Sequence, residues 1–347
     1  MKLRRELWLD VAKMIGILLV VYGHSSEGPQ SITFIYWFHM PLFFIISGYL
    51  FKTVDTFNEL KFYIKKLICK LLVPYCTYLI LFTFYRHVAM VSDHPLTFSS
   101  LGHEILKLFI GGRFITSIYG VFWYITCLFF TQILFALICL YFKKDLHRIL
   151  IVIGCYLIAH FETVKLIPHI GENYFNQITI PWNMDVALIA VCYLAFGYFT
   201  KTLLSKIPNY LGAVSLLLSV IFMTLYEMNI IDYHLSLKYL KYDHLFLDAV
   251  IPLTMTIAFF YGCQKLTRLK MIDSFTILGR ESLTIMYIHI FANMIFSQIF
   301  EYGPLLYTII GIVVPLLLKK FIIEALPTIR PFFIGLSVKR SSKVQTA

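Results

Sequence analysis

The feature that most constrains this chain is a succession of long apolar runs separated by short polar segments. Of its 347 residues, 59% are hydrophobic and only 14% are charged, whereas a soluble domain carries about 25% charged residues. A helix needs about 20 mostly apolar residues to cross the ~30 Å hydrocarbon core of a membrane. Runs of that reach occupy residues 7–25, 33–51, 71–91, 121–142, 148–164, 185–201, 209–227, 245–263, 282–300 and 305–323.

These runs predict an all-α, polytopic integral membrane bundle of about ten transmembrane helices. Strands of a membrane barrel would instead alternate in polarity over about ten residues. The second, fifth and sixth runs are short or interrupted, so the number of spans is open by one or two.

The distribution of basic residues predicts the orientation of this bundle. Lys and Arg concentrate in cytoplasmic loops. If the N-terminus is cytoplasmic, most of the 30 basic residues fall in inside segments, and those left outside are Arg86, Lys107, Arg113, Lys165, Lys238 and Lys241. We therefore expect both termini in the cytoplasm. The same distribution explains the net charge of +11 without nucleic acid as a partner, although membrane lipids with anionic headgroups would be attracted.

Nothing in the sequence divides the chain into separate domains. No linker or internal repeat is evident, so we expect one transmembrane domain over residues 1–330 and a short basic cytoplasmic tail over 331–347. The start imitates a signal peptide, but Asp10 and Lys13 interrupt its apolar stretch and no small-residue cleavage site follows, which favours a retained first helix.

Metal binding and disulfides are not expected. The seven cysteines form no C-x-x-C pair and lie in or beside apolar runs, which is typical of small buried side chains. The long outside segment 86–120 contains His87, His94 and His103, but their spacing matches no compact ligand set. A solvated loop is the preferred interpretation.

Three ionisable residues interrupt the first apolar run: Asp10, Lys13 and His24. At 100° per residue, Lys13 and His24 are about 20° apart around a helix and about 16 Å apart along it. Asp10 lies one turn before Lys13, within reach of an ion pair. The three therefore share one stripe, and ionisable groups inside a membrane helix are functional candidates by default. Alternatively, Asp10 and Lys13 form a packing ion pair with Lys13 extended to the boundary, and His24 is an ordinary interfacial residue.

The second run adds a more specific pattern, because its residues 38–51 read FHMPLFFIISGYLF. Together with the D-x-x-K-x10-H pattern of the first run, this stretch resembles the membrane-bound acyltransferase 3 family. The resemblance implies ten core helices and transfer of an acyl group from cytoplasmic acyl-CoA to an extracytoplasmic sugar or polysaccharide.

Three further segments share this resemblance: the basic stretch 65–75, the segment 122–125, and the G-x-x-S-L pattern at 279–283 that leads to Tyr287-Ile288-His289. The resemblance covers the whole chain, and the first 75 residues carry most of it. Lys13, Lys66 and Lys70 stand where Arg is common in the family, and Lys lacks the bidentate fork of Arg.

The chemistry of acyl transfer assigns roles to these residues. A hydroxyl that attacks a thioester must lose its proton, and histidine suits that task because its pKa lies near working pH. We expect His24 to be the general base, or alternatively a transient acyl carrier. Lys13, paired with Asp10, would orient the donor.

The phosphates of acetyl-CoA, a donor substrate and not a tightly bound cofactor, would lie near Lys65, Lys66 and Lys70. The resemblance makes His289 a further candidate as an orienting or donor-binding group, and His39 and Trp123 are candidates for substrate binding. A lone histidine on an apolar helix more often hydrogen-bonds a neighbour, and Trp123 is equally suited to packing.

The function that follows is O-acetylation of a cell-surface glycan or lipid-linked sugar at the plasma or inner membrane. Acetyl is the default implied by the resemblance, with succinyl as an alternative. A transporter or polysaccharide exporter is the competing class, in which intramembrane charges would form a substrate path. It is disfavoured because acidic residues in the helices are few and no repeated half is evident. A structural scaffold would leave the stripe on the first helix unexplained.

Overall fold

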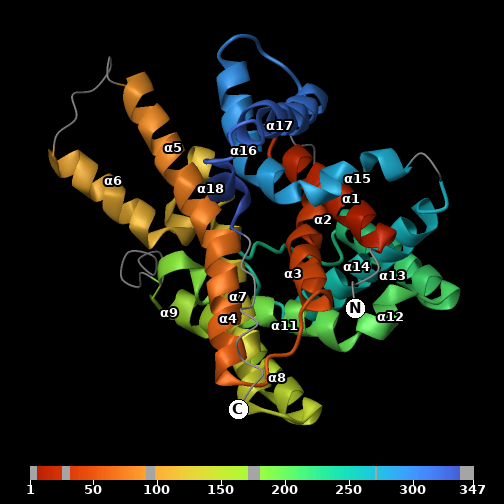
Figure 1. The fold of residues 1–347 in the computed structure, drawn as a ribbon. Coiled ribbons are helices and arrows are strands. Elements are labelled where there is room, and N and C mark those ends of the chain that lie inside the picture. The colour runs from red at the N-terminus through yellow and green to blue at the C-terminus, as the bar shows by residue number, and fades with distance from the viewer. Residues whose placement is uncertain (1–5, 26–31, 91–97, 171–179, 270–271, 337–347) are drawn as a thin grey trace, which may run out of the picture.

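The computed structural model describes residues 6–25, 32–90, 98–170, 180–269 and 272–336. Within these ranges the chain forms helices and no strands, and one isolated bridge joins Ser236 and Lys241. The helices pack side by side into one bundle (Figure 1). Seven segments are long and apolar enough to cross a membrane: Phe57–Val88, Ser117–Tyr141, Asp145–Ile170, Pro181–Phe199, Asn209–Glu227, Leu247–Leu266 and Pro304–Ile323. The predicted all-α polytopic membrane bundle is confirmed.

Each of the ten apolar runs contains helix. In chain order the α-helices are α1 (Leu7–Gly23), α2 (Ile32–Tyr36), α3 (His39–Tyr49), α4 (Phe57–Leu67), α5 (Val73–Met90), α6 (Phe98–Ile110), α7 (Trp123–Tyr141), α8 (Asp145–Phe161), α9 (Ile167–Ile170), α11 (Val186–Phe199), α12 (Lys201–Ser205), α13 (Asn209–Glu227), α14 (Leu247–Leu266), α15 (Ile272–Arg280), α16 (Ser282–Ser297), α17 (Pro304–Leu318) and α18 (Arg330–Ile334).

The helices depart from the predicted runs in three places. The second run is broken at Trp37 and Phe38, where α2 ends and α3 begins. The helix of the third run begins before the apolar residues, at Phe57, because α4 and α5 form one long helix. The segment 86–120, predicted to be an outside loop, includes helix α6, and His94 of that segment lies outside the described residues. α1 has 17 residues and α16 has 16, fewer than the roughly 20 that a perpendicular span needs. The number of ten membrane spans therefore stays a prediction.

Glycines let the helices that carry the candidate residues approach one another closely. A Cβ on Gly48 of α3 would overlap the main-chain carbonyl of Leu194 in α11, and a Cβ on Gly197 of α11 would overlap that of Ile45 in α3. Small residues at such crossings are the usual way in which membrane helices pack. The close contact fixes α3, and with it the position of His39 at its first residue.

The long α4–α5 helix contains a wide π turn at Ile68–Leu72. Pro74 follows it and has no N–H to donate to the preceding turn, and such turns often occur at functional sites. The main-chain N–H of Leu336 donates to the carbonyl of Cys69 in this turn at 3.0 Å, and Phe333 packs its ring 5.2 Å from that of Tyr78. The beginning of the predicted tail therefore packs against the bundle.

Candidate active site

The bundle contains a cavity of about 1140 Å³. Its walls come from α1, α3, the α4–α5 helix, α7, the junction of α15 and α16, and the segment between α13 and α14. Lys13 and His24 both line it, so the two ends of the predicted stripe on α1 open into one space. Asp10 is buried and is not among the lining residues.

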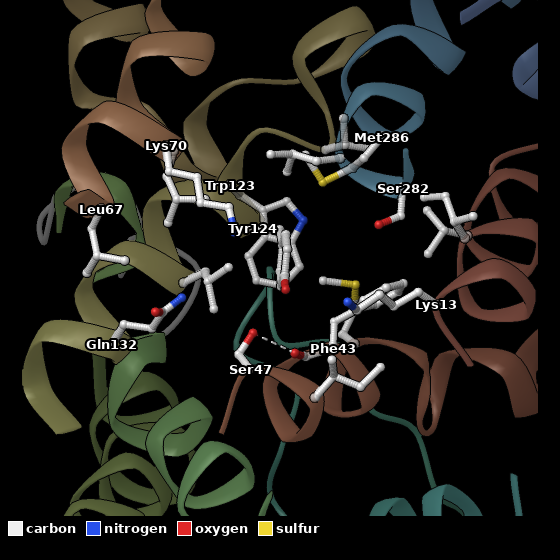
Figure 2. Close-up of a pocket in the computed structure, with 18 of the residues that line it drawn as sticks. Lys13, Phe43, Ser47, Leu67, Lys70, Trp123, Tyr124, Gln132, Ser282 and Met286 are labelled. Atoms are coloured by element: carbon white, nitrogen blue, oxygen red, sulfur yellow. Dashed lines mark hydrogen bonds between the residues drawn. The ribbon is translucent and has the colours of Figure 1, made fainter. Parts of the chain in front are cut away.

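Four basic side chains line one part of the cavity, here called the basic end: Lys13, Lys66, Lys70 and Arg280. Lys66 and Lys13 are both close enough to Lys70 to repel its charge. Figure 2 shows Lys13 and Lys70 extending into the cavity from opposite walls, with Ser282 near Lys13. Positive charges that face one space favour the binding of an anion there.

The helical period explains which lysines of the α4–α5 helix reach the basic end. Lys66 and Lys70 are four residues apart and share a face with Glu59, Tyr63 and Leu67, all of which line the cavity. Lys65 is rotated 100° from Lys66. It is exposed and is not among the lining residues, so the structure separates it from the two lysines with which the sequence grouped it.

Gly279 positions the fourth cation. A Cβ on Gly279 would overlap the main-chain carbonyl of Asp10, so α15 lies directly against α1. Arg280 follows at the end of α15, and Ser282 begins α16 with its N-terminal end at the cavity. The first turn of a helix carries a partial positive charge, which adds to that of Arg280 and Lys13.

A second group of residues forms what we call the histidine end: His24, His39, Tyr36 and Lys238, all lining the cavity. His24 ends α1 as its C-cap residue, and its side chain is exposed to the cavity. The Tyr36 hydroxyl donates to the carbonyl of Gly23 at 2.7 Å, which ties α2 to the end of α1. The ring of Tyr36 in turn packs edge-on against His39 at 5.0 Å between centroids.

His289 lies behind His24, with 5.4 Å between the ring centroids. It is buried, and its Nδ1 lies 3.0 Å from the carbonyl of Ile285 and 2.9 Å from that of Met286. Since carbonyls only accept, Nδ1 carries the hydrogen and Nε2 is the acceptor. Among the described residues Nε2 has no hydrogen-bond partner. His289 is not among the lining residues, and the structure places it beside His24.

His39 and Trp123, the two candidates for substrate binding, both line the cavity. The Nδ1 of His39 donates to the carbonyl of Ile35 at 2.8 Å, which leaves Nε2 as the acceptor nitrogen. Trp123 lines the cavity at the start of α7, next to Tyr124, as Figure 2 shows.

Arg280 and Lys238 are basic lining residues to which the sequence assigned no role. Arg280 was part of a recognised motif, but its direction into the cavity depends on how α15 packs on α1. Lys238 lies in a segment predicted to be an outside loop. The one signal available was the alternation of apolar residues at Tyr233, Leu235 and Leu237, which is unusual for a solvated loop and typical of chain with one buried face.

Comparison with known proteins identifies the family of this chain. No curated protein and no solved structure matches the chain. The family described as "Acyltransferase domain" matches residues 6–319, a span that includes every residue of the basic end and the histidine end. The chain is a multi-pass membrane protein that belongs to the acyltransferase 3 family.

Proposed function

We propose that this protein is an O-acetyltransferase that moves an acetyl group from cytoplasmic acetyl-CoA to a hydroxyl of an extracytoplasmic surface sugar. The observation that carries the proposal is the continuity of the cavity, which joins the basic end to the histidine end within one bundle. Only the acyl group and the thin pantetheine arm of the donor would need to enter the membrane-embedded part.

The basic end provides the donor site of this proposal. Lys13, Lys66, Lys70 and Arg280 would hold the phosphates of CoA, assisted by the N-terminal end of α16 at Ser282. Lys13 and His24 are about 16 Å apart along α1, a span that the extended pantetheine arm bridges. The thioester would then lie beside His24.

The histidine end provides the chemistry. His24 would take the proton from the acceptor hydroxyl as its oxygen attacks the thioester carbonyl carbon. The new C–O bond forms, the C–S bond breaks, and the proton passes from His24 to the departing thiolate of CoA. The ring of His289 lies 5.4 Å from that of His24 between centroids, and no group in the described part of the chain donates to its buried Nε2. This nitrogen would orient the His24 ring by accepting its N–H and would stabilise the imidazolium as it forms.

A transfer assay decides between this activity and export. Purified chain reconstituted in vesicles would receive acetyl-CoA labelled in the acetyl group and unacetylated envelope polysaccharide. Covalent label in the polysaccharide is the expected result. Movement of the polysaccharide across the vesicle membrane without CoA, and without label in the glycan, would establish a transporter instead.

The lysines of the α4–α5 helix offer a matched pair for the donor site. We expect Lys70→Ala to raise the KM for acetyl-CoA by about 10-fold to 100-fold, because a hydrogen bond to a charged group contributes about 1.5–3 kcal/mol. Lys65→Ala removes the same charge from the same helix outside the cavity lining, and should leave this KM within about 2-fold, as exposed charges contribute little. Equal effects of both substitutions in steady-state kinetics would place the phosphates elsewhere.

A further inference from the structure

The segment between α13 and α14 is folded into the bundle. Among its residues, Tyr233, Leu235, Leu237, Leu240 and Tyr242 are buried, and the paired backbones of Ser236 and Lys241 close it into a tight loop. Backbone that is buried in protein must have its polar groups paired, and this pairing supplies partners for part of the loop. Residues 235–239 also form part of the cavity wall.

Contacts from three other parts of the chain hold this loop in place. Thr163 donates to the carbonyl of Tyr242 at 2.6 Å, and Asn183 donates to the carbonyl of Lys238 at 3.1 Å. The carboxylate of Asp248 accepts from the main-chain N–H of His244 at 2.9 Å. The loop is therefore a fixed element of the cavity wall.

Lys238 is the charged residue at the centre of this loop. Its side chain is buried, with 8% of the residue exposed, and its Nζ donates to the carbonyls of Ile115 at 3.2 Å and Gly120 at 3.0 Å. An ammonium carries three N–H donors. Two are used by these carbonyls, and the third faces the cavity side on which the ring centroid of Tyr239 lies 5.1 Å from Nζ, with no oxygen acceptor for it among the described residues. Within the described part of the chain no carboxylate forms an ion pair with Lys238. Burial of a cation without a paired anion costs free energy, and an anion bound in the cavity would offset this cost.

The position of Lys238 identifies the negative charge that would complement it. It lines the same cavity as His24, and so does Tyr239, whose ring lies beside its Nζ. Under the proposed function, the base that takes the hydroxyl proton lies next to the thioester carbonyl. Negative charge would therefore develop on the carbonyl oxygen inside the cavity that His24 and Lys238 both line.

We propose that Lys238 is a catalytic residue that stabilises the oxyanion of the tetrahedral intermediate; this inference rests on the proposed acetyl transfer. When the acceptor oxygen bonds to the thioester carbon, the π electrons of the C=O bond move to its oxygen, and the free N–H of Lys238 donates to that oxygen. When the C=O bond re-forms, the C–S bond breaks and the thiolate leaves. Two main-chain carbonyls hold Nζ in advance, and such preorganised donors give the largest electrostatic gains in catalysis.

The protonation of Lys238 should make the rate of acetyl transfer depend on pH. Burial lowers the pKa of Lys238 to about 8. The cationic form is the active one, so its contribution is complete well below pH 8 and is lost as the pH rises through this value. The other ionisable groups at this end are His24, His39, Tyr36 and Tyr239. Protonation of His24 removes the base and lowers activity at acid pH, which is the opposite limb of the profile.

The test uses purified full-length chain, acetyl-CoA and unacetylated envelope polysaccharide, with kcat and both KM values measured. We expect Lys238→Met, which keeps the length of the side chain, to lower kcat by about 100-fold to 1000-fold with both KM values nearly unchanged. Lys241→Met removes an exposed charge from the same loop and should keep the wild-type kcat. An unchanged kcat with a raised KM for the polysaccharide would overturn the proposal and make Lys238 an acceptor anchor.

A second variant keeps the test decisive if the methionine substitution impairs folding. Lys238→Arg retains the charge at every accessible pH, because the guanidinium pKa exceeds 12. We expect the fall in kcat near pH 8 to disappear in this variant, and its persistence would overturn the proposal. If wild-type protein transfers no label at all, the proposed function itself fails, whereas an active wild type with an active Lys238→Met variant refutes the oxyanion role alone.

Discussion

The substitution His24→Ala should lower acetyl transfer to the polysaccharide by at least about 1000-fold, within the range that a general base contributes. His24 is the group at the histidine end that combines exposure to the cavity with a place on the same helix as Lys13. Its neighbours His39 and His289 are both buried, and His289 is not among the residues that line the cavity. Incorporation of labelled acetyl groups by membranes of equal protein content measures the effect.

The control for this variant is His234→Ala, which removes an exposed histidine outside the cavity lining and should leave the rate unchanged. Added imidazole should restore part of the activity of His24→Ala, because the truncated side chain opens space in a cavity of about 1140 Å³. Full acetylation of the surface glycan by His24→Ala, seen by NMR of that glycan, would contradict the assignment. A stable label on wild-type protein before the acceptor is added would instead make His24 an acyl carrier.

The apolar runs were sufficient to predict the class of fold, because length and hydrophobicity alone decide whether a segment can cross a bilayer. The stripe of α1 was predictable for a similar reason: the helical period places Lys13 and His24 on one side wherever the helix lies. Both residues line the cavity. The class of fold and the stripe on α1 were predictable because both depend on local sequence alone.

The other walls of the cavity depend on how distant segments pack, and the sequence predicted them less well. Lys65, Lys66 and Lys70 look equivalent as a basic cluster, but the rotation of the α4–α5 helix turns Lys65 away. Lys238 looks like an ordinary loop cation until hydrogen bonds from Thr163 and Asn183 fix its loop in the wall. The pairing of Asp10 with Lys13 stays a prediction, and Asp10 enters the site through its backbone, against which Gly279 packs.

That contact gives Gly279→Ala a large expected effect on both the bundle and the basic end. The added Cβ would overlap the main-chain carbonyl of Asp10, and a helix backbone cannot move aside as a side chain can. Forced overpacking of this kind costs about 1–3 kcal/mol or more. It should also move Arg280 and the start of α16 away from Lys13.

We therefore expect Gly279→Ala to lower both the thermal stability of the purified protein in detergent and its affinity for acetyl-CoA. Gly262→Ala is the matched control, because Gly262 also lies in a helix but a Cβ there would meet nothing within 4 Å. Alanine is the better helix former by about 1 kcal/mol, so this variant should be at least as stable as the wild type. Equal melting temperatures and equal KM values for the two variants would show that α15 can withdraw from α1 without consequence. In that case Arg280 and Ser282 would have no part in donor binding, and Lys13, Lys66 and Lys70 would have to hold the phosphates alone.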